Sequence, residues 1–112
     1  RDAGLDDNTL VVFTSDNGGS LPHAQNNDPW RDGKQSHFDG GLRVPFMMRW
    51  PGQIAPGSRS DYAGLSFDLF PTFVELAGGK PADDLDAESL TASCILSGAK
   101  GARRTVARAT TP

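Results

Sequence analysis

The sequence predicts an α/β fold with a mostly parallel sheet, and three features of the chain support that prediction. Residues 9–14 form a continuous apolar, β-branched run without alternation, which is typical of a strand buried on both faces. Turn-forming residues follow at 15–19, and a long polar loop covers 20–36. Residues 67–77 have apolar side chains at helical spacing. In α/β sheets ligands bind beyond the carboxyl ends of the strands, so the loop is the first place to look for a site.

The individual elements can be placed more closely. The first strand is expected at residues 10–15 and a second at 43–50, where Pro-Gly ends it. The helix at 67–77 can be capped by the residues at its start, and a Gly-Gly pair ends it. We expect it to pack on the sheet through Phe67, Phe70 and Val74, which share one face.

Composition and charge restrict the possible partners. The chain has 112 residues, enough for one small domain or a piece of a larger one, and 13 Gly and 8 Pro predict much loop. A net charge of −3 without a basic stripe argues against a nucleic-acid partner. No apolar run approaches the ~18 residues of a membrane span. The single cysteine excludes an intrachain disulfide, and the chain does not begin with Met, so localisation stays open.

Asp16 and Asn17 are the first candidates for chemistry, because they come directly after the first expected strand. A carboxylate and an amide oxygen are hard ligands suited to Ca²⁺ or Mg²⁺. Two ligands are too few for Ca²⁺, which takes six to eight oxygens. Gly18 and Gly19 would let the backbone approach an ion closely. The alternative is an ordinary turn in which these side chains make Asx hydrogen bonds.

Lys34 is the second candidate, and it lies between Gly33 and Gln35 in the long loop. Its ammonium group could hold an anionic group such as sulfate or phosphate. The alternative is a solvated loop lysine with no partner.

Three further polar residues are open to two interpretations each. His23 and His37 could serve as proton donors or ligands, or be plain loop residues. Arg43 is expected to pair with a buried carboxylate and fix the loop, in preference to contacting a substrate.

Taken together, four segments in order resemble the sulfatase family, within the alkaline-phosphatase-like superfamily. The likeness is strong over residues 5–79, and its segments are 8–19, 31–45, 50–57 and 68–78. The resemblance implies part of an alkaline-phosphatase-like sandwich, with a mostly parallel central sheet flanked by helices. Residues 1–98 would be the C-terminal portion of the catalytic domain, and residues 99–112 a tail or a truncated subdomain.

The resemblance also implies a mechanism. In the family, a cysteine or serine in a Cys/Ser-x-Pro/Ala-x-Arg motif becomes formylglycine, whose hydrate attacks the sulfur of a sulfate ester while Ca²⁺ (or Mg²⁺) polarises the sulfate oxygens. Asp16 and Asn17 would be two of the metal ligands. Lys34 would be both the substrate-binding and the catalytic residue, holding the sulfate and the leaving oxygen. The substrate would be a small sulfate ester or a sulfated carbohydrate, and the family suggests a periplasmic or secreted location.

The chain departs from the family pattern in several places. The nucleophile motif, the paired aspartates that complete the metal site, and the upstream His and Lys of the sulfate pocket are all absent. Asp39 stands where the family usually has Glu, and Asp86-Ala87 replaces Asp-Gly. We therefore expect a sulfatase fragment that is inactive alone.

Two alternatives remain beside that expectation. One is a fragment of a related phosphoester or phosphonate hydrolase, and the other is a non-catalytic binding module of the same fold. The Lys34 segment and Trp50-Pro51-Gly52 favour the sulfatase.

Overall fold

A computed structural model describes residues 3–95 of the chain, which divides into two compact units. One unit is residues 10–49, and the other comprises the described residues 3–9 and 50–95. The tail predicted at residues 99–112 lies outside the described residues, so the domain assignment stays a prediction. Within residues 3–95, no helix has the length and apolar character needed to cross a membrane.

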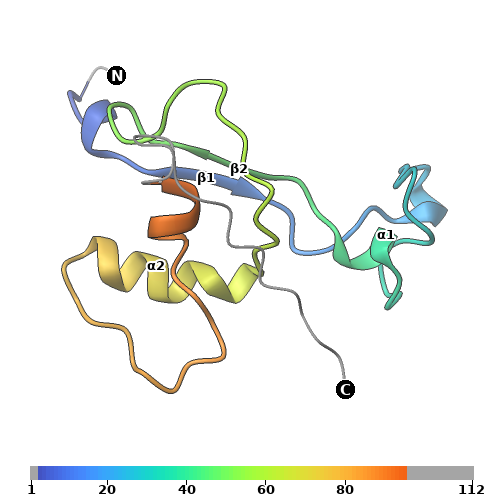
Figure 1. Ribbon diagram of the computed structural model, residues 1–112. Helices are drawn as coiled ribbons and strands as arrows, with labels where there is room; N and C mark the ends of the chain where they lie inside the picture. The colour runs from blue at the N-terminus through green and yellow to red at the C-terminus, as the bar shows by residue number, and fades with distance from the viewer. Residues whose placement is uncertain (1–2, 96–112) are drawn as a thin grey trace. The chain divides into compact units, whose positions relative to one another are not determined.

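The unit of residues 10–49 is built on a two-stranded ribbon (Figure 1). Strand β1 (Val11–Thr14) pairs with β2 (Phe46–Arg49), and Val11 lies opposite Arg49. Both strands fall where the sequence predicts them. The two strands pair in antiparallel orientation, so the prediction of parallel strands is wrong for the pair that the structure describes. The physical reason is that the segment between them leaves and returns at the same end of the ribbon, which makes the strands run in opposite directions.

Apolar side chains of the ribbon remain exposed. Phe13 pairs with Met47 across the ribbon, and 59% of Phe13 and 56% of Met47 are accessible to solvent. The prediction that this strand is buried on both faces is therefore wrong within residues 3–95. A ribbon of two strands has no second layer inside its own unit, so nothing in that unit covers either face.

The other unit is organised by one helix. A 3₁₀ turn η3 (Ser66–Asp68) leads directly into α2 (Leu69–Leu76), close to the predicted helix. Pro71 is tolerated because it lies in the first turn, where backbone N–H groups have no partner within the helix. The helix ends at Leu76, and Gly78 follows with a φ of +80°, which suits a residue without a side chain.

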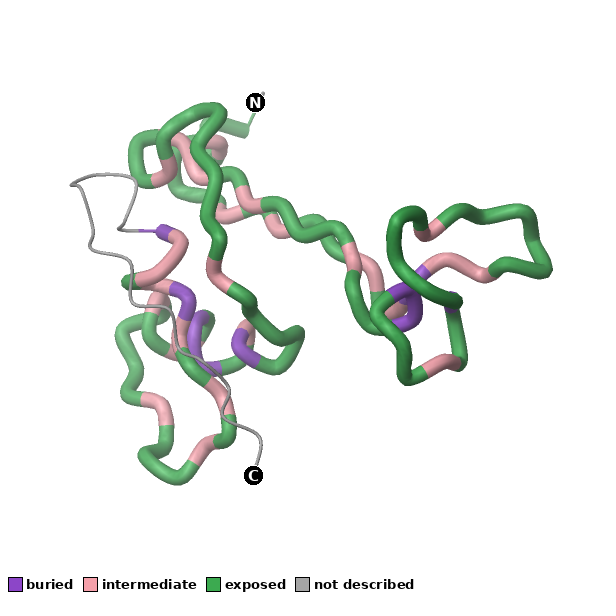
Figure 2. Tube along the Cα trace, turned by 45° about the vertical axis from the view of Figure 1, so that its right-hand side comes forward, coloured by how far each residue is buried: buried purple, intermediate pink, exposed green. Residues whose placement is uncertain are grey.

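Buried hydrogen bonds attach residues 88–90 to this helix. The Thr72 side chain is fully buried, donates to the Asp68 carbonyl oxygen (2.6 Å) and accepts from the Leu90 N–H (2.8 Å). The buried Asp68 carboxylate accepts from the backbone N–H groups of Leu65 (2.8 Å) and Glu88 (3.0 Å). Leu90 is consequently 98% buried, since only 2% of it remains exposed. Figure 2 shows in purple how few segments of the described chain are buried.

The predicted packing of the helix through Phe67 and Phe70 is wrong. Phe70 is 60% exposed and Phe67 is also exposed, whereas Val74 is half-buried. The reason is geometric. At about 100° per residue, Asp68 and Thr72 share a face opposite to Phe70 and Val74, and their hydrogen bonds hold residues 88–90 on that polar face.

A pH titration tests the packing of residues 88–90. Tyr62 donates a hydrogen bond from its hydroxyl to Glu88 (3.1 Å). Burial raises the pKa of Tyr62 to about 12, and the hydrogen bond to Glu88 and its negative charge add to the effect. Tyr62 is the only tyrosine in the chain, so the ultraviolet absorbance of tyrosinate reports it alone.

We expect ionisation of Tyr62 near pH 12, and a midpoint closer to the ordinary value of about 10 in Glu88→Gln. Because the folded pKa is raised, the associated stability is present below about pH 10 and is lost as the pH rises through 12. A wild-type midpoint near 10 would show that Tyr62 is neither buried nor bonded to Glu88 as described.

Candidate functional site

In the loop between β1 and β2, backbone segments pack closely against one another at several glycines. It contains a 3₁₀ turn η2 (Leu21–His23) and a short helix α1 (Asp39–Leu42). Three backbone hydrogen bonds hold it together: Gly18 N–H to Gly41 O (2.9 Å), Lys34 N–H to Gly19 O (3.0 Å) and Gly40 N–H to Arg31 O (2.9 Å). We call the set Gly18, Gly19, Gly33, Gly40 and Gly41 the glycine junction.

Side chains are excluded from this junction by the closeness of the backbones. A Cβ atom on Gly18 would overlap the Gly40 carbonyl oxygen, and one on Gly33 would overlap the Gly19 carbonyl oxygen. The sequence indicated that Gly18 and Gly19 could approach an ion. In the structure Gly18 approaches the backbone of α1, so its small size serves the packing of the loop.

Asn27 braces the same junction with its side-chain amide. Its Oδ1 accepts from the Gly19 N–H (2.7 Å), and its Nδ2 donates to Gly19 O (2.9 Å) and to Asp32 O (3.1 Å). One side chain thus joins the turn that follows β1 to the segment that carries Lys34.

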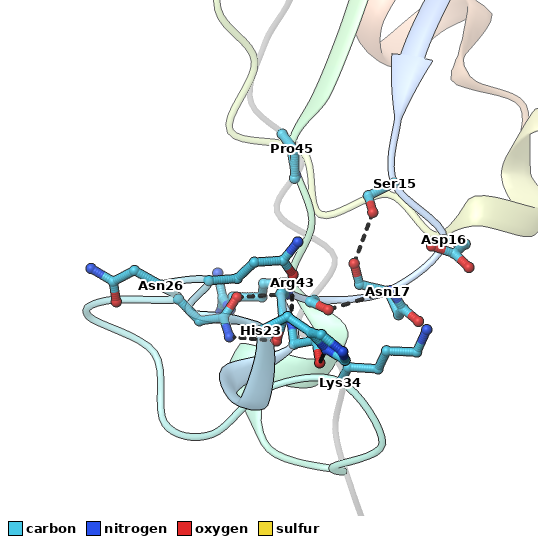
Figure 3. A pocket seen from close by; sticks show the side chains of 13 residues that line it. Ser15, Asp16, Asn17, His23, Asn26, Lys34, Arg43 and Pro45 are labelled. Carbon is cyan, nitrogen blue, oxygen red and sulfur yellow. Dashed lines mark hydrogen bonds between the residues drawn. The ribbon is translucent and has the colours of Figure 1, made fainter.

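A pocket of about 710 Å³ opens beside the junction (Figure 3). All three site residues predicted from the sequence, Asp16, Asn17 and Lys34, line it. His23 and Arg43 line it as well, whereas His37 does not. The remaining lining residues are Ser15, Gly18, Gly19, Ser20, Gln25, Asn26, Asn27 and Pro45.

The side-chain oxygens of Asp16 and Asn17 are available to a ligand. Ser15 Oγ donates to the backbone carbonyl oxygen of Asn17 (2.9 Å), and Asn17 Nδ2 donates to the backbone oxygen of Gly18 (3.3 Å). Within residues 3–95, no donor is bonded to Asn17 Oδ1 or to the exposed Asp16 carboxylate. Asp16 therefore does not form the Asx turn that was the alternative to a metal ligand.

Hard oxygen donors of this kind fit Ca²⁺ or Mg²⁺, and two of them fill only part of the shell. Among the residues that the structure describes, no group of three or more His, Cys, Asp or Glu could hold a metal ion. Asp16 and Asn17 can therefore provide a part of a metal site, and further ligands must complete it.

Lys34 lies in a backbone segment with unusual conformations on both sides of it. Its neighbours Asp32 and Gln35 both have positive φ, 66° and 74°, which is uncommon for residues other than glycine. The Lys34 side chain is exposed, and no hydrogen bond or ion pair engages its ammonium within the described residues. In Figure 3 it extends on the side of the pocket where Asn17 lies. The Lys34 ammonium group is therefore available to bind an anion.

Arg43 and His23 are both held by neighbours in the loop. Arg43 Nε lies 3.2 Å from the Asp39 carboxylate, and the guanidinium stacks over the Trp30 ring at 4.1 Å. The predicted partnership with a buried carboxylate is wrong, because the Asp39 side chain is half exposed. Such a pair adds little stability, and the stacking on Trp30 provides a second contact for the Arg43 side chain.

His23 Nδ1 lies 2.8 Å from the Ser20 hydroxyl, which fixes one of its ring nitrogens and leaves the other open.

A comparison with models of protein families identifies the family of the chain. Residues 1–79 match the family model described as sulfatase. The chain belongs to the sulfatase family. The resemblance inferred from the sequence is thereby confirmed, and every residue that lines the pocket lies in the matched part.

Two curated sulfatases and one solved structure show how much of a sulfatase the chain spans. N-acetylgalactosamine-6-sulfatase of Mus musculus is 47% identical over 88 residues, covering 75% of this chain and 17% of that protein. Ulvan-active sulfatase of Formosa agariphila is 42% identical over 79% of this chain and 15% of its own length. The crystal structure of Ps i-CgsB in complex with k-i-k-neocarrahexaose superposes with a TM-score of 0.75 at 42% identity, covering 80% of this chain and 20% of that one.

The chain therefore spans 15–20% of the length of these sulfatases.

The glycine junction can be tested by adding one methyl group. In Gly33→Ala the new Cβ meets the Gly19 carbonyl and lies 2.7 Å from Asn27 Nδ2, both of which must shift. We expect the hydrogen-exchange protection of the Lys34 amide to fall about ten- to a hundredfold, which corresponds to ~1–3 kcal/mol of overpacking.

Gly64→Ala is the matched control, since its Cβ would meet atoms only at 3.4 Å or more. Equal protection of Lys34 in both variants would mean that Gly33 is not closely packed.

Proposed function

We propose that this chain supplies part of the metal- and sulfate-binding region of a sulfatase that hydrolyses sulfate esters. The observation that carries the proposal is the meeting of Asp16, Asn17 and Lys34 in one pocket. They come from two segments separated by more than a dozen residues, and two oxygen ligands and one free cation are the groups that such chemistry needs.

Asp16 and Asn17 have complementary tasks in this proposal. The Asp16 carboxylate gives one negative charge and the Asn17 amide gives a neutral oxygen, both directly after β1. When bound, Ca²⁺ or Mg²⁺ would polarise the sulfate oxygens, and formylglycine outside this chain would provide the nucleophile. The carboxylate, which no described residue neutralises, draws the cation to this side of the pocket.

Lys34 acts on the sulfate itself. Its Nζ donates hydrogen bonds to the sulfate and to the ester oxygen, which gains negative charge as the S–O bond breaks. A charge that grows in the transition state is stabilised more than the ground state, so Lys34 contributes to the rate as well as to binding.

Sulfated carbohydrate is the proposed class of substrate. His23, Gln25 and Asn26 add hydrogen-bonding side chains to the pocket, which suit a ligand rich in hydroxyl groups. The names of two relatives refer to N-acetylgalactosamine and to ulvan, and the crystal structure of Ps i-CgsB holds a neocarrahexaose. These names support a sulfated carbohydrate as the class of substrate.

The proposed fold of the whole protein is an alkaline-phosphatase-like sandwich with a mostly parallel sheet. The exposed apolar side chains of β1, β2 and α2 support it, because such surfaces are stable when further layers cover them.

Calorimetry tests the metal ligands. We expect the 112-residue chain to bind Ca²⁺ more weakly than about micromolar, because affinity follows the number and charge of the ligands. Asp16→Ala should abolish this binding. Asp83→Ala is the control, since Asp83 is an exposed carboxylate paired with Lys80 outside the pocket.

Binding tighter than micromolar would mean a more complete site than the one proposed. Calcium binding that survives Asp16→Ala would remove Asp16 from the metal site.

A turnover assay tests the dependence on groups outside the chain. The purified 112-residue chain should not hydrolyse nitrophenyl sulfate, because its sequence contains no formylglycine motif. Loss of a covalent nucleophile costs several orders of magnitude in rate. Hydrolysis by the chain that Lys34→Ala abolishes would contradict the proposal.

A further inference from the structure

We infer that Asn27 is a positioning residue that couples the metal turn, residues 15–19, to the Lys34 segment, residues 32–36. The inference rests on the proposed function of Asp16, Asn17 and Lys34, and it adds a residue that touches neither metal nor sulfate. Asn27 acts through the backbone at Gly19 and Asp32, and so sets how far apart the two halves of the site lie.

The Gly19 carbonyl oxygen is the point where the two segments meet. It accepts from the Lys34 N–H at 3.0 Å and from Asn27 Nδ2 at 2.9 Å, which uses both of its lone pairs. The second proton of Asn27 Nδ2 serves the Asp32 carbonyl at 3.1 Å, next to Gly33 and Lys34. Without Asn27, the Lys34 N–H to Gly19 O bond would be the one hydrogen bond that joins the two segments directly among residues 3–95.

The backbone of Asn27 is itself fixed. Its carbonyl accepts from the Trp30 N–H at 2.8 Å, and the Asn26 side chain accepts from the Asp28 N–H at 3.0 Å. The side-chain amide of Asn27 is therefore attached to a fixed turn. Little conformational freedom is lost when this amide makes its hydrogen bonds.

Only asparagine meets the chemical requirement at this position. The site needs one acceptor and two donors on a single planar group, which Asp cannot offer. Aspartate at residue 27 would keep the acceptor for Gly19 N–H and turn its other oxygen toward two carbonyl oxygens. Glutamine has the right groups on a longer stem, which would place its amide one methylene farther from the backbone than the amide of Asn27.

Coupling between two ligands measures this positioning. If Ca²⁺ at Asp16 and Asn17 lies beside an anion at Lys34, each ligand should strengthen binding of the other by the same factor. The Asp16 carboxylate offsets one of the two charges of Ca²⁺. For net unit charges about 4 Å apart in water, that factor is about fivefold at low salt. A residue that only stabilises the fold would change the fraction of folded chain and leave the coupling intact.

The experiment uses the 112-residue chain, Ca²⁺ and methyl sulfate, followed by NMR shifts of the Asn17 and Lys34 signals. In the wild type, Ca²⁺ should raise the affinity for methyl sulfate about fivefold, and methyl sulfate should raise the affinity for Ca²⁺ equally. In Asn27→Asp and Asn27→Ala, each ligand should still shift its own residue, and the coupling should fall to about onefold. Asn8→Asp is the control for added charge, and it should keep the wild-type coupling.

The outcomes separate the two proposals. Coupling in the wild type that persists in both Asn27 variants overturns the role of Asn27 and leaves the proposed function standing. Absence of coupling in the wild type overturns both. Should the variants lose the β1–β2 ribbon, exchange of the Asn27 side-chain amide protons in the wild type decides: slow exchange supports the inference, and exchange as fast as in a free amide overturns it.

Discussion

The hydrogen bonds on the Gly19 carbonyl oxygen are the constraint on which the site depends. They fasten the segment of Lys34 to the turn that carries Asp16 and Asn17, and Asn27 adds the second donor. Backbones can approach this closely because the positions around the contact are glycines. The charged side chains of Asp16 and Lys34 are then not needed to hold the loop together, and they remain available to ligands. Rigid backbone and unengaged side chains are the combination that a preorganised site requires.

Buried polar bonds have a similar role at α2 in the other unit. Thr72 and Asp68 satisfy the backbone N–H groups of Leu90 and Glu88, so residues 88–90 pack on the polar face of the helix. A buried, satisfied polar group specifies one arrangement more sharply than an apolar contact, because any other arrangement leaves it unpaired. This explains why the aromatic face of α2 is left exposed within the described residues.

The sequence predicted the elements well and their partners poorly. The apolar run located β1, and helical spacing located α2, since both patterns are local. Spacing identifies which residues share a face and says nothing of what covers it, so Phe70 was assigned to the core although it is exposed. Residue type and position made Asp16, Asn17 and Lys34 candidates, with an ordinary turn and a solvated lysine as alternatives. The resemblance to sulfatases then assigned their roles, which stay predictions. Asn27 was missed because its importance lies in three hydrogen bonds between distant residues, for which no short motif exists.

The central claim is that the metal turn and Lys34 form one site. The most direct measurement is paramagnetic broadening by Mn²⁺, which prefers the same oxygen ligands as Ca²⁺ and Mg²⁺. Substoichiometric Mn²⁺ should broaden the NMR signals of Asp16, Asn17 and the Lys34 side chain together. In Asp16→Ala the signals of Asn17 and Lys34 should both stay sharp. Broadening of Asp16 and Asn17 while the Lys34 signals stay sharp would show that the turn and the lysine belong to separate places, and would contradict the account.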